Sequence, residues 1–201
     1  MNGIRLVARG VALMAVVGCT GAAEAQVELP PLVNDHMVIQ RDAEVPLHGQ
    51  APAGTMVRVE FDGDTRSARA DTDGRWRVRL PPRPAGGPHD IVISAGADTV
   101  VVRDILVGDV WIASGQSNME WPVADALNAE AEIAAADDPA IRNFRVPQSW
   151  SYTPARQLVG GEWEVSDSVN VGAHSAVAYF FARQLREHVG VPIGIIDNSW
   201  G

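Results

Sequence analysis

The hydrophobic pattern of this chain changes near Asp104, and that change constrains the fold more than any other feature. Upstream of it, apolar and polar residues alternate, as in residues 57–61 and 75–80. Downstream of it, apolar residues form continuous runs at 105–107 and 110–113. Alternation is typical of strands with one solvent-facing side, whereas continuous runs are typical of strands buried on both faces of a parallel sheet. We therefore expect an all-β part followed by an α/β part.

Residues 26–104 are predicted to form a small β-sandwich module. The strand over 57–61 is followed by Asp62-Gly63, a strong turn signal. In the strand over 75–80 three arginines alternate with three apolar residues, and the preceding Asp73-Gly74 predicts a hairpin. Two more short strands are expected, at 91–93 and 100–102. Because this part holds no cluster of titratable residues, we interpret it as an accessory module that packs on the next domain or helps present a substrate.

Residues 105–201 are predicted to form a doubly wound α/β domain, because strand and helix patterns alternate there. The expected elements are strands over 105–107, 110–113, 141–146 and 191–196, helices over 125–136 and 175–189, and an irregular loop over 148–161. Ser175 can cap the second helix, and Gly190 suits its end. The part is small for such a domain and stops directly after a strand, so we expect only the first portion of the domain here.

The first 25 residues are expected to be a signal peptide rather than part of the fold. A basic start precedes the apolar run 11–18, and Ala23-Glu24-Ala25 offers small residues to a signal peptidase. The run is too short to span a bilayer. Residues 16–19, ending in the only cysteine, Cys19, resemble a lipobox. Cys19 is therefore either discarded or lipidated, and in both cases export to the periplasm or beyond is expected.

Charge and motif spacing exclude several classes of function. The formal net charge of −9 argues against a nucleic-acid-binding protein, which normally carries a basic patch. No His, Cys or carboxylate spacing suggests a metal site, and no glycine-rich loop suggests phosphate binding. We therefore predict no metal and no other cofactor.

A candidate nucleophile, Ser117, follows the apolar run 110–113 directly, in Gly115-Gln116-Ser117-Asn118. Functional groups collect at the carboxyl ends of parallel strands, and a helix that begins there points backbone N–H groups at the serine. Such groups can hold the oxyanion of an acyl-transfer intermediate. The alternative is that Ser117 is a helix cap and Asn118 a turn residue. Both interpretations remain open on this pattern alone.

The extended motif, Gly-Gln-Ser-Asn-Met-Glu-Trp-Pro-Val at 115–123, resembles the nucleophile block of sialate O-acetylesterases, within the SGNH hydrolases. The resemblance extends over nearly all of the expected mature chain. Weaker similarities follow in the order in which the family has them, at 34–41, 73–76, 80–82, 107–111, 175–181, 192–196 and 198–201.

The resemblance implies a serine esterase that removes O-acetyl groups from carbohydrates without a cofactor. Ser117 would attack the acetyl ester, and water would then hydrolyse the acetyl-enzyme. The Ser117 N–H would be one oxyanion donor. Gly201 matches the glycine of the family's second block and would supply another. Gln116, Asn118 and Trp121 are assigned to the turn and the substrate cleft.

The family's Asp-x-x-His block, which supplies the general base, does not follow Ser117. His174 is interpreted as a helix-entry residue and His188 as a solvated one. We therefore expect the base beyond residue 201 and little activity from this polypeptide alone. The expected substrates are O-acetylated sialic acids, with acetylated xylan or another polysaccharide as the alternative. A non-catalytic carbohydrate-binding fragment is the alternative of another class.

Overall fold

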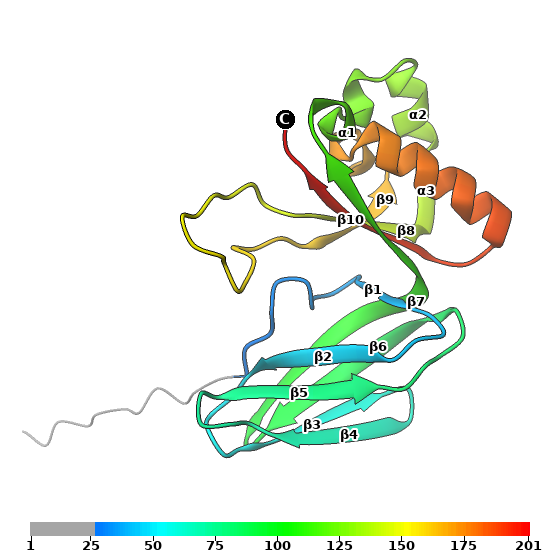
Figure 1. Cartoon of the computed structure of the whole chain (residues 1–201). Coiled ribbons are helices and arrows are strands. Elements are labelled where there is room, and N and C mark those ends of the chain that lie inside the picture. Colours follow the sequence, from blue (N-terminus) through cyan, green and yellow to red (C-terminus); the bar gives the residue numbers. More distant parts are fainter. Residues whose placement is uncertain (1–26) are drawn as a thin grey trace, which may run out of the picture.

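The computed structural model describes residues 27–201, so the expected signal peptide and Cys19 lie outside it. The described chain is a mixed α/β structure made mostly of strands (Figure 1). Its strands are β1 (Val38–Gln40), β2 (Val45–Gln50), β3 (Met56–Phe61), β4 (Asp64–Arg69), β5 (Arg75–Leu80), β6 (Gly86–Ala95), β7 (Asp98–Gly115), β8 (Asp137–Arg145), β9 (Trp163–Asp167) and β10 (Ile193–Ser199). An eight-stranded sheet has the order β4-β3-β6-β7-β10-β8-β9 with β1 also paired to β7, and β2 and β5 form a separate two-stranded sheet.

The alternation predicted for the first part is confirmed in strands β3 and β5. The apolar residues of both strands are buried, and the polar residues between them are exposed. Asp62 and Gly63 join β3 to β4 with φ angles of 47° and 82°. A two-residue hairpin turn of this kind needs left-handed backbone at both positions, so the turn signal is also confirmed.

The hairpin predicted at Asp73-Gly74 is wrong. A turn is present there, and the Asp71 carboxylate accepts hydrogen bonds from the Asp73 and Arg75 N–H groups at 2.9 and 2.8 Å. However, β5 pairs with β2, whereas β4 pairs with β3. The turn thus carries the chain from one sheet to the other. The inward residues of β2 and β5 join those of β3, β6 and β7 in one hydrophobic core.

Strand β7 corrects the predicted division into separate short strands. The runs at 100–102, 105–107 and 110–113 belong to one strand that spans Asp98–Gly115. Its first half pairs antiparallel with β6 up to Val107, and its second half pairs parallel with β10 from Asp109. The expected boundary after Asp104 therefore falls inside a hydrogen-bonded strand, where no linker separates the two parts.

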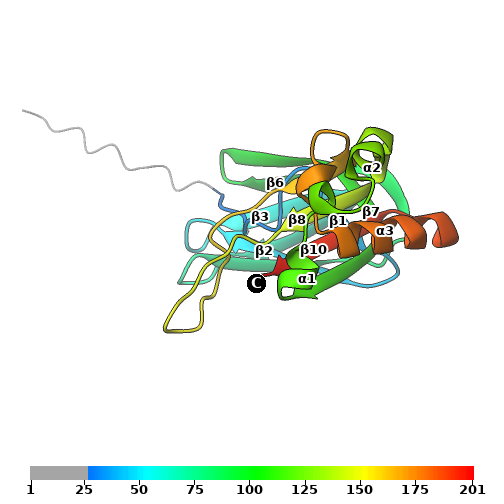
Figure 2. The same ribbon diagram turned by 90° about the horizontal axis from the view of Figure 1, so that it is seen from above.

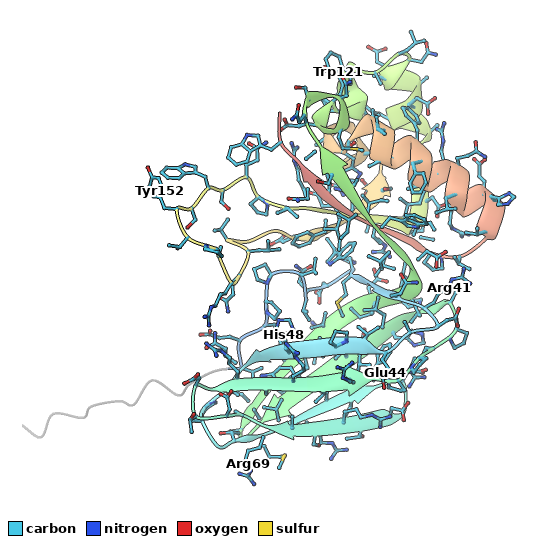
Figure 3. All side chains as sticks on the ribbon, in the orientation of Figure 1. Arg41, Glu44, His48, Arg69, Trp121 and Tyr152 are labelled. Atoms are coloured by element: carbon cyan, nitrogen blue, oxygen red, sulfur yellow. The ribbon has the colours of Figure 1, made fainter. Side chains whose placement is uncertain are left out.

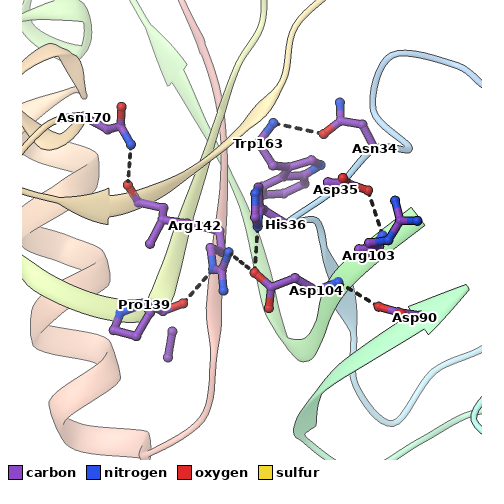
Figure 4. A network of polar contacts seen from close by, with 12 residues as sticks. Asn34, Asp35, His36, Asp90, Arg103, Asp104, Pro139, Arg142, Trp163 and Asn170 are labelled. Carbon is purple, nitrogen blue, oxygen red and sulfur yellow. Dashed lines mark hydrogen bonds and ion pairs between the residues drawn. The ribbon is translucent and has the colours of Figure 1, made fainter. Parts of the chain in front are cut away.

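Asp104 lies at the middle of β7 with a left-handed φ of 55° and anchors a polar network (Figure 4). Its carboxylate accepts a hydrogen bond from Arg142 at 2.8 Å and lies 2.6 Å from the His36 ring nitrogen, and its N–H donates to Asp90 at 3.1 Å. Partial burial acts to raise the pKa of Asp104, but the hydrogen bonds and charges of Arg142 and His36 outweigh it and lower that pKa below its ordinary value. The network connects the N-terminal segment, β7 and β8.

The α/β part contains the predicted helix α3 (Ala176–Val189) with the predicted ends. The Ser175 hydroxyl accepts a hydrogen bond from the Ala178 N–H at 3.2 Å, and Gly190 has a left-handed φ of 71°. Strands β7, β10 and β8 are parallel, as expected. No helix within residues 27–201 is long and apolar enough to cross a bilayer.

The predicted burial of the run 110–113 is wrong, and the packing of helix α3 shows a related feature. Helix α3 packs on the sheet through small residues such as Ala178 and Ala182, whereas Val177 and Phe181 are exposed. The run 110–113 is not covered on both faces, because Trp111 is 45% exposed and Ile112 is 71% exposed. The Trp111 and Phe181 rings instead contact each other edge to face, with centroids 5.2 Å apart. Alanine side chains let the helix approach the sheet closely, while Val177 and Phe181 remain outside.

The segment between β7 and β8 also differs from prediction. In place of one helix over 125–136, the chain forms α1 (Ser117–Glu120), the 3-10 turn η1 (Val123–Asp125) and the short helix α2 (Ala129–Ala135). Residues 137–139, expected to end the helix, open β8. Strand β9, antiparallel to β8, and the turn η2 (Val171–Ala173) were not predicted. The irregular loop is confirmed over residues 146–162, called the long loop below, and extends away from the sheet (Figures 1 and 2).

Candidate active site

The candidate site lies where strands β7 and β10 end side by side. Gly115, the last residue of β7, is in register with Ser199, the last residue of β10. The Trp200 N–H donates to the Gly115 carbonyl at 3.1 Å, which extends this pairing by one residue. Ser117 opens helix α1 immediately afterwards. The carboxyl ends of parallel strands are where α/β sheets place functional groups, so the location fits an active site.

Ser117 and Gly201 are in direct contact at this edge, and both are exposed. A Cβ atom added to Gly201 would lie 2.2 Å from the Ser117 nitrogen and 2.6 Å from its Oγ. Only glycine therefore fits this position in the present arrangement. Gly115 is required for a similar reason, because a Cβ there would lie 2.9 Å from the Met119 Cβ. The structure thus brings together two residues that the sequence analysis assigned to separate motifs.

Glu120 binds several groups around Ser117, and the sequence analysis gave it no role. Its carboxylate accepts hydrogen bonds from the Gly201 N–H at 2.8 Å, from the Arg145 guanidinium at 3.3 Å and from the Gln148 amide. The Gly201 N–H is therefore already engaged by the Glu120 carboxylate. The one signal in the sequence was the position of Glu120 inside the 115–123 motif, since its three partners lie far along the chain.

Gln116, Asn118 and Trp121 flank Ser117 on the turn and on α1. All three are exposed, and Trp121 is 53% exposed (Figure 3). The Trp121 backbone is fixed on both sides, because its N–H donates to the Ser117 carbonyl and its carbonyl accepts from Ala176. These positions are compatible with the roles assigned to them from the sequence, in shaping the turn and lining a cleft.

His174 is buried and has a carboxylate partner of its own. Its Nε2 lies 3.0 Å from a Glu164 carboxylate oxygen, and the side chain is 3% exposed. Burial lowers the pKa of His174 below its ordinary value of 6.5, and the hydrogen bond to Glu164 opposes that shift only in part. Within residues 27–201 no hydrogen bond joins Ser117 to a histidine. His174 therefore supports the fold next to the site, at the entry of α3.

Asp197 and Ser199 shape the end of β10 and were also missed from the sequence. Asp197 is 1% exposed, and its carboxylate accepts hydrogen bonds from the Ser199 N–H at 3.1 Å and the Ser199 hydroxyl at 2.6 Å. The bonds fix the backbone just before Trp200 and Gly201. In the described part of the chain, no group of three or more His, Cys, Asp or Glu side chains is arranged to hold a metal ion.

The long loop adds an aromatic pair to the same side of the molecule. Trp150 is 73% exposed and Tyr152 is 94% exposed, with ring centroids 5.2 Å apart at an interplanar angle of 85°. Gln148, at the start of the loop, donates to Glu120. The Trp150–Tyr152 pair therefore lies on a loop that is hydrogen-bonded to Glu120 of the candidate site.

The chain matches known proteins over most of its length, although no family model matches it. Sialate O-acetylesterase of Homo sapiens is 31% identical over 189 residues, which cover 84% of this chain and 36% of that protein. Sialate O-acetylesterase of Mus musculus is 28% identical over 211 residues, which cover 96% and 39%. The crystal structure of a carbohydrate acetylesterase from Xanthomonas citri superposes with a TM-score of 0.86 at 46% identity and covers 87% of this chain and 40% of that one. The chain belongs to the sialate O-acetylesterase family.

Membership of the sialate O-acetylesterase family confirms the resemblance carried by the 115–123 motif. The mixed α/β fold is the one that the Xanthomonas citri enzyme has over the matched region. The chain spans 36 to 39% of the length of the curated relatives it matches.

Proposed function

We propose that this chain carries the nucleophile of a carbohydrate O-acetylesterase, and that Ser117 is that nucleophile. The observation that carries the proposal is the contact between Ser117 and Gly201 at the shared end of β7 and β10. A serine exposed there, at the start of a helix and against a glycine backbone, suits attack on an ester carbonyl. Family membership supports the same reaction. We further propose that residues 105–201 are the first portion of an SGNH-type domain, preceded by a β-sandwich module.

The proposed reaction has two steps. Ser117 Oγ attacks the acetyl carbonyl carbon and passes its proton to a general base. The base returns the proton to the departing sugar hydroxyl, which leaves an acetyl-enzyme. Water then attacks the acetyl-enzyme with the help of the same base, and acetate leaves. Because no hydrogen bond joins Ser117 to a histidine within residues 27–201, we expect the base to be a histidine outside them.

The oxyanion of each tetrahedral intermediate needs hydrogen-bond donors directed at it. We assign the Ser117 N–H, in the first turn of α1, and the Gly201 N–H to this role. The Gly201 N–H points at Glu120 in the resting arrangement, so substrate binding must displace that contact. Glu120 is therefore a positioning residue: it orders Gly201, Arg145 and Gln148 around the serine before the reaction.

O-acetylated sialic acids are the substrates we propose first, because the curated relatives are sialate O-acetylesterases. An acetylated polysaccharide such as xylan is the second candidate. It is favoured by the exposed Trp150–Tyr152 pair, since aromatic faces are suited to stacking along a chain of sugar rings. We also propose that the protein is exported by its first 25 residues, with Cys19 either removed or lipidated.

The test replaces Ser117 in the protein expressed from its complete gene. Ser117→Ala should lower acetate release from acetylated sialic acid or acetylated xylan by about 10³-fold or more, with an unchanged circular dichroism spectrum. Ser114→Ala, at an exposed serine near the end of the same strand, is the matched control and should retain activity. A fluorophosphonate probe should label Ser117 in the unmodified protein.

Either of two results would contradict the proposal. If the Ser117→Ala variant releases acetate as fast as the unmodified protein, Ser117 is not the nucleophile. Absence of both acetate release and probe labelling in the unmodified protein would favour the non-catalytic, carbohydrate-binding alternative.

A further inference from the structure

A cavity of about 830 Å³ lies between the outer face of the β2–β5 sheet and the long loop, away from Ser117. Three segments line it: the outer face of β2 and β5, the N-terminal residues 28–31, and the loop residues Arg156 and Gln157. In Figure 1 the loop extends from the α/β part toward the side of the molecule where β2 lies, and Figure 3 labels His48 on that strand. A volume of this size is typical of a ligand site. We call the cavity the basic groove.

The floor of the basic groove is formed by side chains of β2 and β5 that can donate hydrogen bonds. His48 on β2 is directly opposite Arg77 on β5, and Gln50 is directly opposite Arg75. All four residues are on the solvent side of the ladder, where directly opposite side chains lie about 5 Å apart. Two cross-strand pairs of donors therefore point to the same side.

Two arginines of the groove have no acidic partner within residues 27–201. Arg77 and Arg156 make no ion pair there, whereas Arg79, on the same face of β5 but outside the groove, pairs with Glu44. Arg75 pairs with the exposed Asp73. Two free guanidinium groups in one cavity are notable in a chain whose formal net charge is −9.

Two carboxylates, those of Asp71 and Glu28, also line the groove. Asp71 accepts hydrogen bonds from two N–H groups of its own turn, which hold its carboxylate at that turn. Glu28 lies on the wall that the N-terminal segment forms, next to the apolar residues Leu29, Pro30 and Pro31. The groove thus combines two unpaired guanidinium groups, two carboxylates, neutral amides and one apolar wall.

We propose that the basic groove binds a carboxylate-bearing sugar unit of an acidic glycan. A guanidinium group matches a carboxylate in a bidentate manner, and the cavity is lined by Arg77 from β5 and by Arg156 from the long loop. The amides of Gln50 and Gln157 suit sugar hydroxyls, and Leu29 and the prolines suit the C–H face of a ring. This site is separate from Ser117 and does not rest on the proposed esterase reaction.

The long loop connects the basic groove to the candidate active site. Gln148 near its start is bound to Glu120 beside Ser117, and Arg156 and Gln157 further along it line the groove. A glycan in the groove therefore contacts the same segment that flanks the nucleophile. The groove is therefore a second binding site for an acidic polymer, separate from the residues that act on its acetyl groups.

The test measures binding of a hexamer of galacturonic acid to the Ser117→Ala protein expressed from its complete gene, so that turnover plays no part. Calorimetry should detect binding, and the double variant Arg77→Ala with Arg156→Ala should weaken it by about ten-fold or more. Arg79→Ala removes a charge from the same face outside the groove and should leave the affinity unchanged. A neutral xylose hexamer should bind at least about ten-fold more weakly than the acidic probe.

Several results would overturn the proposal. These are no binding of the acidic hexamer, equal binding of the neutral one, or equal weakening by Arg79→Ala, which would indicate unspecific charge attraction. If the double variant melts at a lower temperature, Arg77→Gln with Arg156→Gln, which retains side-chain length, replaces it. Hydrolysis of a small aryl acetate by the protein with an intact Ser117 should survive these substitutions, so failure of the groove and failure of the esterase proposal are distinguishable.

Discussion

Ile105 and Ile112 lie on the same strand, yet Ile105 is fully buried and Ile112 is 71% exposed. The first half of β7 pairs with β6 and, at its end, with β1, and it packs into the core of the first part. The second half pairs only with β10 and leads to Ser117. The first half of strand β7 is therefore part of the hydrophobic core, whereas its second half supports the exposed candidate site at Ser117. Burial, rather than strand identity, decides which residues stabilise the fold and which remain available for function.

The largest expected effect tests this difference with one substitution at two places on β7. Ile105→Ala should lower the free energy of unfolding by about 2–5 kcal/mol, because it leaves a cavity in a packed core. Ile112→Ala should change it by no more than about 0.5 kcal/mol. Guanidinium chloride denaturation of the two variants measures both values. Equal costs would mean that both halves of the strand are core.

The second prediction concerns activity rather than stability. Glu120→Ala removes the acceptor that orders Gly201, Arg145 and Gln148, so kcat for acetate release should fall by about 10- to 100-fold with little change in KM. Glu120→Gln, which still offers an acceptor oxygen, should recover part of the loss. Glu130→Gln, on the exposed side of α2, is the control. A change in KM alone would indicate a contact to substrate instead of a positioning role.

The third prediction uses pH to examine the support of the site. Because burial lowers the folded-state pKa of His174 below 6.5, the unfolded chain binds a proton first as the pH falls. The free energy of unfolding should therefore decrease below about pH 6.5, by at most about 1.4 kcal/mol per pH unit, until the pH passes the folded-state pKa. His174→Gln should remove this component when denaturation is compared at pH 7.5 and 5.5. The exposed His188→Gln should retain it, and an unchanged pH dependence in His174→Gln would argue against the assignment.

The smallest expected effect is at the start of α3. Ser175→Ala removes the hydroxyl that accepts from the Ala178 N–H and should cost about 1 kcal/mol of stability. Ser168→Ala, at an exposed turn position, should cost almost nothing. Thermal unfolding of the two variants provides the comparison. A loss in both would show that the effect does not come from the cap.

Several local signals in the sequence predicted local structure correctly, although the hairpin at Asp73-Gly74 and the single helix over 125–136 were wrong. The Asp62-Gly63 turn, the alternation in β3 and β5, and both ends of α3 depend on residues close together in the chain, and all are present. The partner of β5 and the existence of β9 depend on pairing with distant strands, which periodicity does not encode.

The candidate site shows the same division between local and distant information. Ser117 and Gly201 were found from motifs, whereas the role of Glu120 arises only when Arg145, Gln148 and Gly201 are folded onto it. The exposure of the second half of β7 was also missed, because an apolar run looks the same whether or not another element covers it.

The continuity of β7 through Asp104 has a consequence for the length of ligand that the protein can hold. A hydrogen-bonded strand held by Arg142 and His36 joins the part that carries the basic groove to the edge with Ser117, without a linker between them. A single ligand occupies both sites only if it is long enough to span them. A glycan that reaches both is therefore selected by the number of its sugar units as well as by its charge.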